Sequence, residues 1–242
     1  MDERFSRLSA LIGDEACEKL GNAHVIIFGA GGVGAAAIEA IARAGVGNID
    51  IVDGDTVSVS NINRQLIALG STVGLPKAEV AKARVTDINP DAKVTAHKIF
   101  YTADTANEFD LSAYNYVIDA IDMVTSKLLL IENCCSYNVP LICSMGAGNK
   151  LDPSRFRVAD INKTAGCPLA RVIRKELRKR GITRLDVVFS DEEPISPPNP
   201  IENTAGRNPP GSVSFVPPVA GFVMAGHVIK KLAGIDKKEN LG

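Results

Sequence analysis

The stretch from His24 to Gln65 constrains the fold more than any other part of the chain. It reads HVIIFGAGGVGAAAIEAIARAGVGNIDIVDGDTVSVSNINRQ: an apolar β-rich run, a glycine turn, an alanine-rich helix and a second apolar run that ends at Asp53. This order is typical of an α/β unit that binds a nucleotide phosphate. The glycines let the backbone approach a phosphate at the helix N-terminus, where free N–H groups and the helix dipole favour anions. The expected phosphate-binding glycines are Gly29, Gly31, Gly32 and Gly34.

The residues after the second apolar run favour a triphosphate over a dinucleotide. A dinucleotide already has its pyrophosphate on the helix N-terminus, whereas this chain adds an arginine and several amides directly after the strand. The planar guanidinium of an arginine binds two phosphate oxygens at once, and the chain has no GxxxxGK[ST] loop for that task. Asp53 lies about 20 residues beyond the glycines, where a carboxylate can accept the ribose hydroxyls. The expected nucleotide-binding polar residues are Asp53, Asp55, Asn61, Asn63, Arg64 and Gln65.

Two further charged residues fit a phosphate and a metal. Lys77 begins a predicted helix that runs to Ile88, where the positive end of the helix dipole disfavours a cation, so a phosphate contact explains it better than a mobile surface lysine. Asp122 follows a buried run, and ligands bind at the carboxyl ends of strands in open α/β sheets. Asp122 is therefore placed to hold Mg²⁺ together with phosphate oxygens, whereas Asp119 is expected to be structural.

The pattern DxDxVxxSNxNRQ after GxGGxG resembles the ubiquitin-activating-enzyme-like superfamily, whose bacterial members include the adenylating enzymes of thiamine and molybdopterin synthesis. This resemblance runs from Arg4 to about Ala147 and implies ATP-dependent adenylation of a carboxylate. It implies a homodimer in which Arg7, the second arginine of an RYxRQ-like motif, reaches the partner's ATP site, although Leu8 replaces the usual Gln. The catalytic residues that it implies are Arg64, Lys77, Asp122 and Arg7.

Length and composition are those of a globular protein with one elaborated domain. The 242 residues carry a formal net charge of −1, so any binding of nucleic acid must come from a local basic patch. The N-terminus lacks a signal-peptide pattern and no run is long and apolar enough for a membrane span, which predicts a cytoplasmic protein. Five scattered cysteines argue against a disulfide framework, and the absence of CxxC excludes the four-thiolate zinc site of many sulfur-carrier relatives. Cys134, Cys135 and Cys143 are expected in the core.

The predicted fold is α/β, a Rossmann-like doubly wound sheet that is mostly parallel, with a C-terminal α/β extension carrying antiparallel strands. Residues 1–150 form the ATP-binding half of a single adenylating domain, and residues 151–242 form the C-terminal half. Pro, Gly and Asn dominate residues 191–212, which predicts a long mobile loop. A helix over residues 2–20, a short strand from Ser212 to Val216 and a helix from Val219 to about Leu232 are also predicted.

A basic helix is the most unusual feature of the C-terminal half. From Pro168 to Gly181 six cations are balanced by Glu176 alone, in a chain that is otherwise near neutral. A charge run of this kind is usually a solvated face, but this excess favours a surface for a phosphate backbone. The expected tRNA contacts are Arg171, Arg174, Lys175 and Arg178.

The second half, with its PLAR…LRKRGI helix, VFS strand and GSVSFVPPVAG segment, resembles a group of dehydratases that act on threonylcarbamoyladenosine in tRNA. The resemblance implies ATP-dependent closure of the threonylcarbamoyl side chain into a ring. Cys167 departs from the polar residue expected at its position. A monovalent cation is a further candidate cofactor, and a cysteine desulfurase system is a candidate partner, because some bacterial members of the superfamily work beside such enzymes. Two alternatives stay open: adenylation of a sulfur-carrier protein's C-terminal carboxylate, and a nucleotide-binding scaffold without catalysis.

Overall fold

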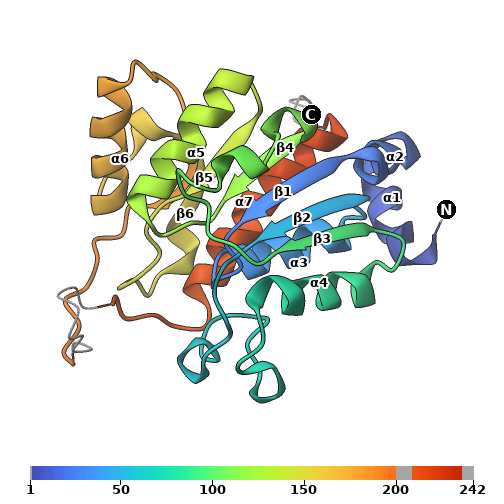
Figure 1. The fold of residues 1–242 in the computed structure, drawn as a ribbon, viewed down its shortest axis with the longest axis horizontal. Helices are drawn as coiled ribbons and strands as arrows, with labels where there is room; N and C mark the ends of the chain where they lie inside the picture. Colours follow the sequence, from blue (N-terminus) through green and yellow to red (C-terminus); the bar gives the residue numbers. More distant parts are fainter. Residues whose placement is uncertain (1, 200–208, 236–242) are drawn as a thin grey trace.

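A seven-stranded sheet with helices on both faces forms the described part of the protein, residues 2–199 and 209–235 of a computed structural model (Figure 1). The strand order is β3-β2-β1-β4-β5-β7-β6. Only the β6–β7 pair is antiparallel, so the predicted doubly wound, mostly parallel α/β fold is confirmed. The strands are β1 (His24–Phe28), β2 (Asn48–Val52), β3 (Lys93–His97), β4 (Tyr116–Asp119), β5 (Leu141–Ser144), β6 (Phe156–Asp160) and β7 (Asp186–Ser190).

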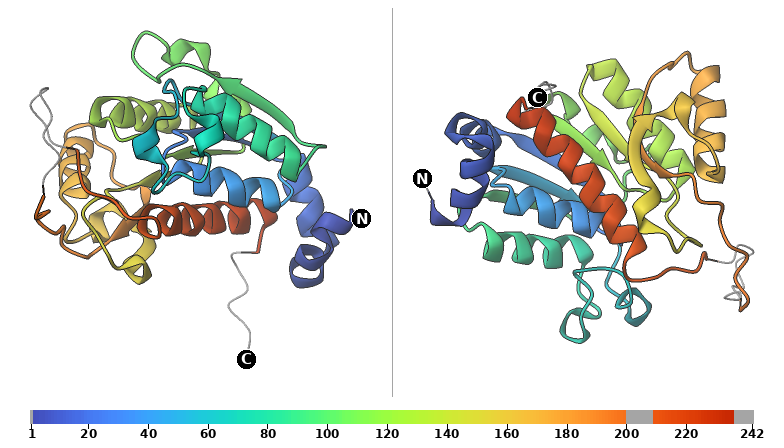
Figure 2. Two further views of the ribbon diagram at one scale, coloured as in Figure 1. Left: turned by 90° about the horizontal axis from the view of Figure 1, so that it is seen from below. Right: turned by 180° about the vertical axis from the view of Figure 1, so that it is seen from behind.

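Helices α3 (Gly34–Arg43), α4 (Lys77–Ile88) and α7 (Val216–Ala233) cover one face of the sheet, which Figure 2 shows from behind. Helices α5 (Val124–Tyr137) and α6 (Pro168–Lys179) cover the other face. The apolar faces of the strands pack between these layers, which places the main core on the α3 and α7 side. Gly221 lets α7 approach α3 closely, because a Cβ there would lie 2.2 Å from the carbonyl oxygen of Val33.

The chain reverses its direction of winding between β1 and β4, and this point positions the site. After β1 the chain continues to β2 on one side, whereas β4 leads to β5 on the other. The register aligns Phe28 with both Val52 and Asp119, so the loops that follow three strands begin at the same level. Loops that leave such a switch point in opposite directions open a crevice at the carboxyl ends of the strands.

Three local predictions differ from the structure. The N-terminal helix is broken at Gly13, whose φ of +86° ends α1 (Ser6–Ile12) before α2 (Asp14–Asn22) begins. The predicted strand from Ser212 to Val216 is wrong, because α7 already begins at Val216 and takes the two prolines into its first turn, where a missing N–H costs nothing. Cys134 and Cys143 are buried as expected, but Cys135 is exposed on the outer side of α5.

The predicted mobile loop, residues 191–212, falls partly outside the described residues, which exclude 200–208. Its described parts, 191–199 and 209–212, contain neither helix nor strand. Within the described ranges, no helix is both long and apolar enough to cross a membrane.

Candidate active site

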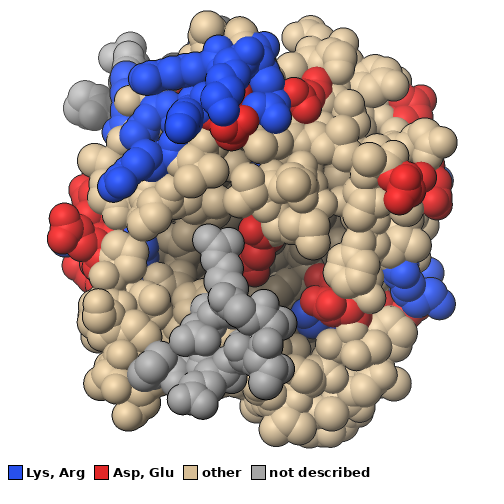
Figure 3. All heavy atoms as spheres, turned by 60° about the vertical axis from the view of Figure 1, so that its left-hand side comes forward, with Lys and Arg blue, Asp and Glu red and all other residues tan. Residues whose placement is uncertain are grey.

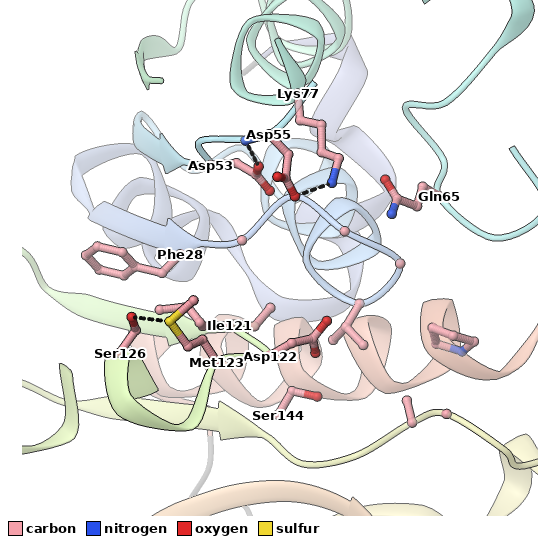
Figure 4. A pocket seen from close by; sticks show the side chains of 18 of the residues that line it. Phe28, Asp53, Asp55, Gln65, Lys77, Ile121, Asp122, Met123, Ser126 and Ser144 are labelled. Atoms are coloured by element: carbon pink, nitrogen blue, oxygen red, sulfur yellow. Dashed lines mark hydrogen bonds and ion pairs between the residues drawn. The ribbon is translucent and has the colours of Figure 1, made fainter. Parts of the chain in front are cut away.

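A cavity of about 710 Å³ lies where the switch point predicts it, at the carboxyl ends of β1, β2, β4 and β5. Figure 4 shows acidic, basic and hydroxyl side chains converging on it from the ends of these strands, from the loops that follow them and from the first turns of α4 and α5. It has a nucleotide side, built by the glycine loop and the residues after β2 and β4. Its other side is built by residues 144–148, Leu169 and a C-terminal stretch. The lining residues of that stretch are Pro209, Pro210, Ser212 and Pro217.

The four predicted glycines have different reasons to lack a side chain. Gly29 has a φ of +94°, and a Cβ there would lie 2.7 Å from the carbonyl oxygen of Ala120. A Cβ on Gly34 would lie 1.7 Å from the carbonyl oxygen of Gly29, so these two residues are required by the fold of the turn itself. A Cβ on Gly31 would meet no close neighbour, whereas Gly32 packs on Pro217. Both residues line the cavity. Gly31 and Gly32 therefore leave the approach that a phosphate needs.

Asp53 lies at the end of β2 with its carboxylate engaged by the protein backbone. Oδ2 accepts a hydrogen bond from the N–H of Ala30 at 2.7 Å, and Oδ1 accepts one from the N–H of Asp55 at 2.9 Å. Burial raises the pKa of this carboxyl, although the two backbone donors act in the opposite direction. Asp53 thus ties the glycine loop to the turn after β2 and still lines the cavity. The structure thus gives Asp53 a bracing role, while its contact with a ribose stays a prediction.

Lys77 enters the cavity from the first turn of α4, as Figure 4 shows. Its side chain is buried, and Nζ donates to Oδ2 of Asp55 at 2.9 Å. Its backbone N–H also donates to the carbonyl oxygen of Asp55, so the two residues are held together twice. Because Asp55 is exposed, its carboxylate can yield the ammonium group to a more highly charged phosphate chain.

Arg64 lines the cavity, but its guanidinium is held back on its own turn. Nη1 donates to the carbonyl oxygen of Ser60 at 3.0 Å and to Oδ1 of Asn63 at 2.9 Å. In the described part of the chain only Nη1 is bonded in this way, which leaves donors of the fork for an anion. Asn63 itself does not line the cavity.

The other two amides of this turn differ in their surroundings. Asn61 stabilises the turn, since its Oδ1 accepts the N–H of Ser58 and closes a capping box. Gln65 is buried beside Gly31, and its Oε1 has no hydrogen-bond partner among the described residues. A buried acceptor without a partner costs free energy, so Gln65 is suited to receive a donor from a bound ligand.

Asp122 projects into the cavity from the turn after β4 (Figure 4). A buried ion pair holds this turn: Asp119 Oδ2 accepts from Lys127 Nζ at 2.7 Å, and Asp119 Oδ1 accepts from the N–H of Ile121 at 2.9 Å. Both charged side chains are fully buried, as expected for a structural Asp119. Burial is the largest influence on the pKa of Lys127 and lowers it, but the charge and hydrogen bond of Asp119 together with other nearby groups raise that pKa overall.

The surroundings of Asp122 fit a magnesium ion that is held with a nucleotide. Among the described residues, no group of three or more metal-ligating side chains could hold a metal ion alone. Mg²⁺ is commonly bound by one or two carboxylates together with substrate phosphates and water. The exposed Asp122 carboxylate offers that donor set only once a phosphate chain is present.

Several cavity residues were missed by the sequence analysis. Phe100, Ile121 and Met123 form an apolar wall on the nucleotide side, where an adenine ring could stack. The hydroxyl groups of Ser126, in the first turn of α5, and of Ser144, at the end of β5, also line the cavity (Figure 4). The exposed fractions of Phe100 and Met123, 54% and 56%, are high for apolar residues. Sequence carried no signal for them except that Met123 follows the predicted metal ligand directly.

Arg7 lies apart from the cavity of its own chain. It is an exposed residue of α1, a helix at the edge of the molecule (Figure 1), and it does not line the cavity. The turns between β2 and α4 expose several apolar side chains on the surface. They are Val59, Ile62, Leu69, Val73 and Leu75.

The basic helix α6 presents a patch of cations on the face of the molecule where the cavity opens (Figure 3). Arg171, Lys175 and Arg178 are exposed on it. Arg174 instead turns inward, where Nη1 donates to the carbonyl oxygen of Thr164 at 3.0 Å and to its Oγ1 at 2.6 Å. The guanidinium of Arg174 is thus bonded to Thr164 in the loop before α6, and a tRNA contact by Arg174 stays a prediction.

Comparisons with known proteins settle the family. The model of the ThiF family matches residues 5–242. The chain belongs to the ThiF family. It is 48% identical to the tRNA threonylcarbamoyladenosine dehydratase of Bacillus subtilis, over 96% of this chain and 95% of that protein.

Solved structures are similar to the ThiF-family chain over its whole length. The Escherichia coli tRNA threonylcarbamoyladenosine dehydratase in complex with ATP matches with a TM-score of 0.88 and 36% identity, covering 98% of this chain and 97% of that one. The same enzyme in complex with AMP also gives a TM-score of 0.88, with 38% identity and coverage of 96% and 94%. Both halves of the chain are therefore matched, including α6 and α7.

Proposed function

We propose that the chain dehydrates N6-threonylcarbamoyladenosine in tRNA, using ATP to close the threonylcarbamoyl side chain into a ring. The observation that carries this proposal is a single cavity with two sides. One side has the glycine loop, Arg64, Lys77 and Asp122, while the other opens on the face that carries the cations of α6. The near-complete match to the Bacillus subtilis and Escherichia coli dehydratases supports the same substrate.

The chemistry requires two substitutions. An oxygen of the threonine carboxylate attacks the α-phosphorus of ATP, a new P–O bond forms, and pyrophosphate leaves. The carbamoyl nitrogen of the same side chain then attacks the acyl carbon, AMP leaves with the attacking oxygen, and the nitrogen loses its proton. The second step joins groups that are already tethered, so its proximity advantage lies in the substrate and no protein nucleophile is needed.

The protein stabilises the charge that accumulates on the phosphates. Lys77 exchanges Asp55 for a phosphate, and Arg64 directs its free N–H groups to the same chain. Gln65 supplies the unpaired acceptor Oε1 to a donor of the ligand. Asp122 holds Mg²⁺, which neutralises phosphate charge when it is bound. Hydrogen bonds of Asp53 to the glycine loop and of Asn61 to Ser58 hold the two phosphate-facing loops in place.

A homodimer completes this site. Arg7 is exposed and outside the cavity of its own chain, so a contribution to catalysis must be made to another copy. The exposed apolar residues between β2 and α4 lie next to the cavity-lining turn and supply a surface for that copy. In this arrangement Arg7 of one copy stabilises the phosphates bound by the other.

The tRNA binds through α6. Its exposed cations neutralise backbone phosphates, which fixes the register of the nucleic acid without reading its sequence. The cavity opens on the same face, so the modified nucleoside enters it while the backbone stays on the helix (Figure 3).

Mass spectrometry of tRNA nucleosides tests this function. Purified protein is incubated with ATP, Mg²⁺ and threonylcarbamoylated tRNA, and the nucleosides are then analysed. We expect a product lighter by one water, together with AMP and pyrophosphate, that depends on ATP and is lost in Arg64→Ala. Unchanged tRNA in a preparation that binds ATP would refute the proposal. Carrier-dependent exchange of pyrophosphate into ATP would then favour the sulfur-carrier alternative.

A further inference from the structure

A short segment of the C-terminal half, residues 209–212, lines the cavity and is fastened at two adjacent residues, Gly211 and Ser212. Pro209, Pro210 and Ser212 line the cavity, and the segment lies between the turn after β2 and the loop after β5. It contains no regular secondary structure, so its position depends on the side chains that hold it.

Asn149 holds Gly211 of the 209–212 segment. Its N–H donates to the carbonyl oxygen of Gly211 at 2.8 Å, and its Oδ1 accepts the N–H of Gly211 at 2.6 Å. Asn149 makes this double contact with a φ of +58°, a left-handed conformation that asparagine tolerates better than most residues. The next contact is tight as well, since a Cβ on Gly148 would lie 2.6 Å from Pro210.

Asn63 holds the next residue, Ser212, and connects it to the nucleotide side of the cavity. Its Nδ2 donates to the carbonyl oxygen of Ser212 at 3.0 Å, while its Oδ1 accepts from Nη1 of Arg64 at 2.9 Å. Asn63 is exposed and does not line the cavity, yet it joins two residues that do. One amide group thus couples the position of the segment to the position of the arginine.

We propose that Asn63 and Asn149 are positioning residues that make binding of the tRNA nucleoside and binding of ATP cooperative, an inference that rests on the proposed function. A nucleoside that packs against the 209–212 segment fixes Ser212, and Ser212 fixes the Asn63 amide. The amide then determines whether the Arg64 guanidinium bonds to its own turn or to the phosphates of ATP. The coupling is reciprocal: if the nucleoside favours the ATP-binding placement of Arg64, ATP favours nucleoside binding by the same factor.

Steady-state kinetics at varied ATP and tRNA concentrations measure this coupling. In the wild-type enzyme we expect the KM for ATP to fall about fivefold or more as tRNA rises to saturation. In Asn63→Ala the KM for ATP becomes independent of tRNA, because the link from Ser212 to Arg64 is gone. Asn107→Ala, an exposed asparagine outside the cavity, serves as the matched control and keeps the wild-type coupling.

Two further variants separate the links from simple damage to the fold. Asn63→Asp retains an acceptor for Arg64 but loses the donor to Ser212, so it abolishes the coupling. It also raises the KM for ATP above that of Asn63→Ala, because a carboxylate competes with the phosphates for the guanidinium. Asn149→Gly keeps the left-handed backbone accessible and removes only the side-chain bond to Gly211, so it raises the KM for tRNA while coupling weakens.

Two results overturn the proposal: wild-type coupling in Asn63→Ala, or a wild-type KM for ATP that does not depend on tRNA. Failure of the proposed function is recognised separately, by absence of tRNA turnover in the wild-type enzyme. In that event calorimetry with ATP alone tests the Arg64 link. Asn63→Asp must then bind ATP about tenfold more weakly than wild type, and equal affinities overturn the link.

Discussion

The nucleotide half and the C-terminal half of this ThiF-family chain build their shares of the cavity in different ways. The nucleotide half uses backbone geometry and buried ion pairs: the glycine turn, the Asp53 bridge and the Asp119–Lys127 pair under the β4 turn. The C-terminal half contributes a segment without helix or strand, fastened by asparagine amides, and a helix with exposed cations. On the proposed function, the first half serves chemistry on phosphates and the second holds the tRNA.

This difference predicts which measured quantity each half controls. Substitutions on the nucleotide side should lower the rate of the chemical step, because they remove charge stabilisation. Substitutions on α6 should weaken binding of tRNA and leave ATP binding unchanged, because they act on backbone phosphates.

The largest effect is expected from the cavity cations and Asp122. Arg64→Ala should lower kcat about 10²- to 10³-fold, as removal of a donor that stabilises transition-state charge does. Asp122→Asn should have a similar effect at ordinary Mg²⁺ concentrations. Neither side chain packs in the core, so the thermal midpoint should stay near that of the wild type. Lys93→Ala, an exposed cation on β3, is the control for both measurements. A fall in KM for tRNA without loss of kcat would contradict this assignment.

The next effect is a partial recovery of activity when two inactive variants, one of them at Arg7, are mixed. Arg7→Ala and Arg64→Ala should each be nearly inactive alone, and mixing them under subunit exchange should restore activity to about a quarter of the wild-type level. Half of the dimers formed by exchange are mixed, and each mixed dimer has one site with both arginines intact. Turnover of the mixture is compared with that of each variant alone. No recovery, in a mixture shown to have exchanged subunits, would place Arg7 outside the active site.

The cations of α6 should set the salt dependence of tRNA binding. Removing Arg171, Lys175 and Arg178 together should weaken binding at least about tenfold at moderate salt and reduce the slope against log salt concentration by roughly 2. Arg174→Ala is the matched control on the same helix, because its guanidinium bonds Thr164 rather than the surface. That control should lower the thermal midpoint and keep the slope. Equal slopes for the triple variant and wild type would remove α6 from the tRNA surface.

The smallest effect lies away from the cavity, in the Asp50 cluster of the nucleotide half. Burial alone would raise the pKa of Asp50, but hydrogen bonds from His97, His24 and Tyr114 lower it to about 2. A carboxylate whose pKa is lowered in the folded state stabilises the fold above its unfolded pKa of about 4, and this contribution is lost as the pH falls towards 2. The contribution is about 2 kcal/mol. Comparing the pH dependence of unfolding of wild type and Asp50→Asn measures it, and parallel curves between pH 4 and 2 would contradict it.

The nucleotide side was predictable from sequence because its requirements are local. Gly34 is fixed by its contact with Gly29 in the same turn, Gly29 needs a φ of +94°, and Lys77 lies at the start of a helix, where its charge is unusual. Those constraints appear as a motif of fixed spacing. The fold class followed from the same motif and from alternation of apolar runs with helices.

The other side of the cavity could not be predicted in the same way. Ser144, Leu169 and Pro210 come together from distant parts of the chain, and no local pattern marks their meeting. Asn63 was expected at the nucleotide, but its amide lies on the link to Ser212, a contact 149 residues away in sequence. Arg174 was grouped with its exposed neighbours because a charge pattern does not show that one guanidinium turns inward to Thr164.

Transfer of a labelled oxygen tests the central claim, adenylation of the substrate carboxylate, most directly. The threonine carboxylate of the modified tRNA is prepared with heavy oxygen, and the nucleotide products of a single turnover are analysed by mass spectrometry. The account predicts one heavy oxygen atom in the phosphate of AMP, carried there when the acyl–adenylate is cleaved by the carbamoyl nitrogen. Label in inorganic phosphate with formation of ADP would instead show attack on the γ-phosphorus, and unlabelled AMP would show that the carboxylate is never adenylated.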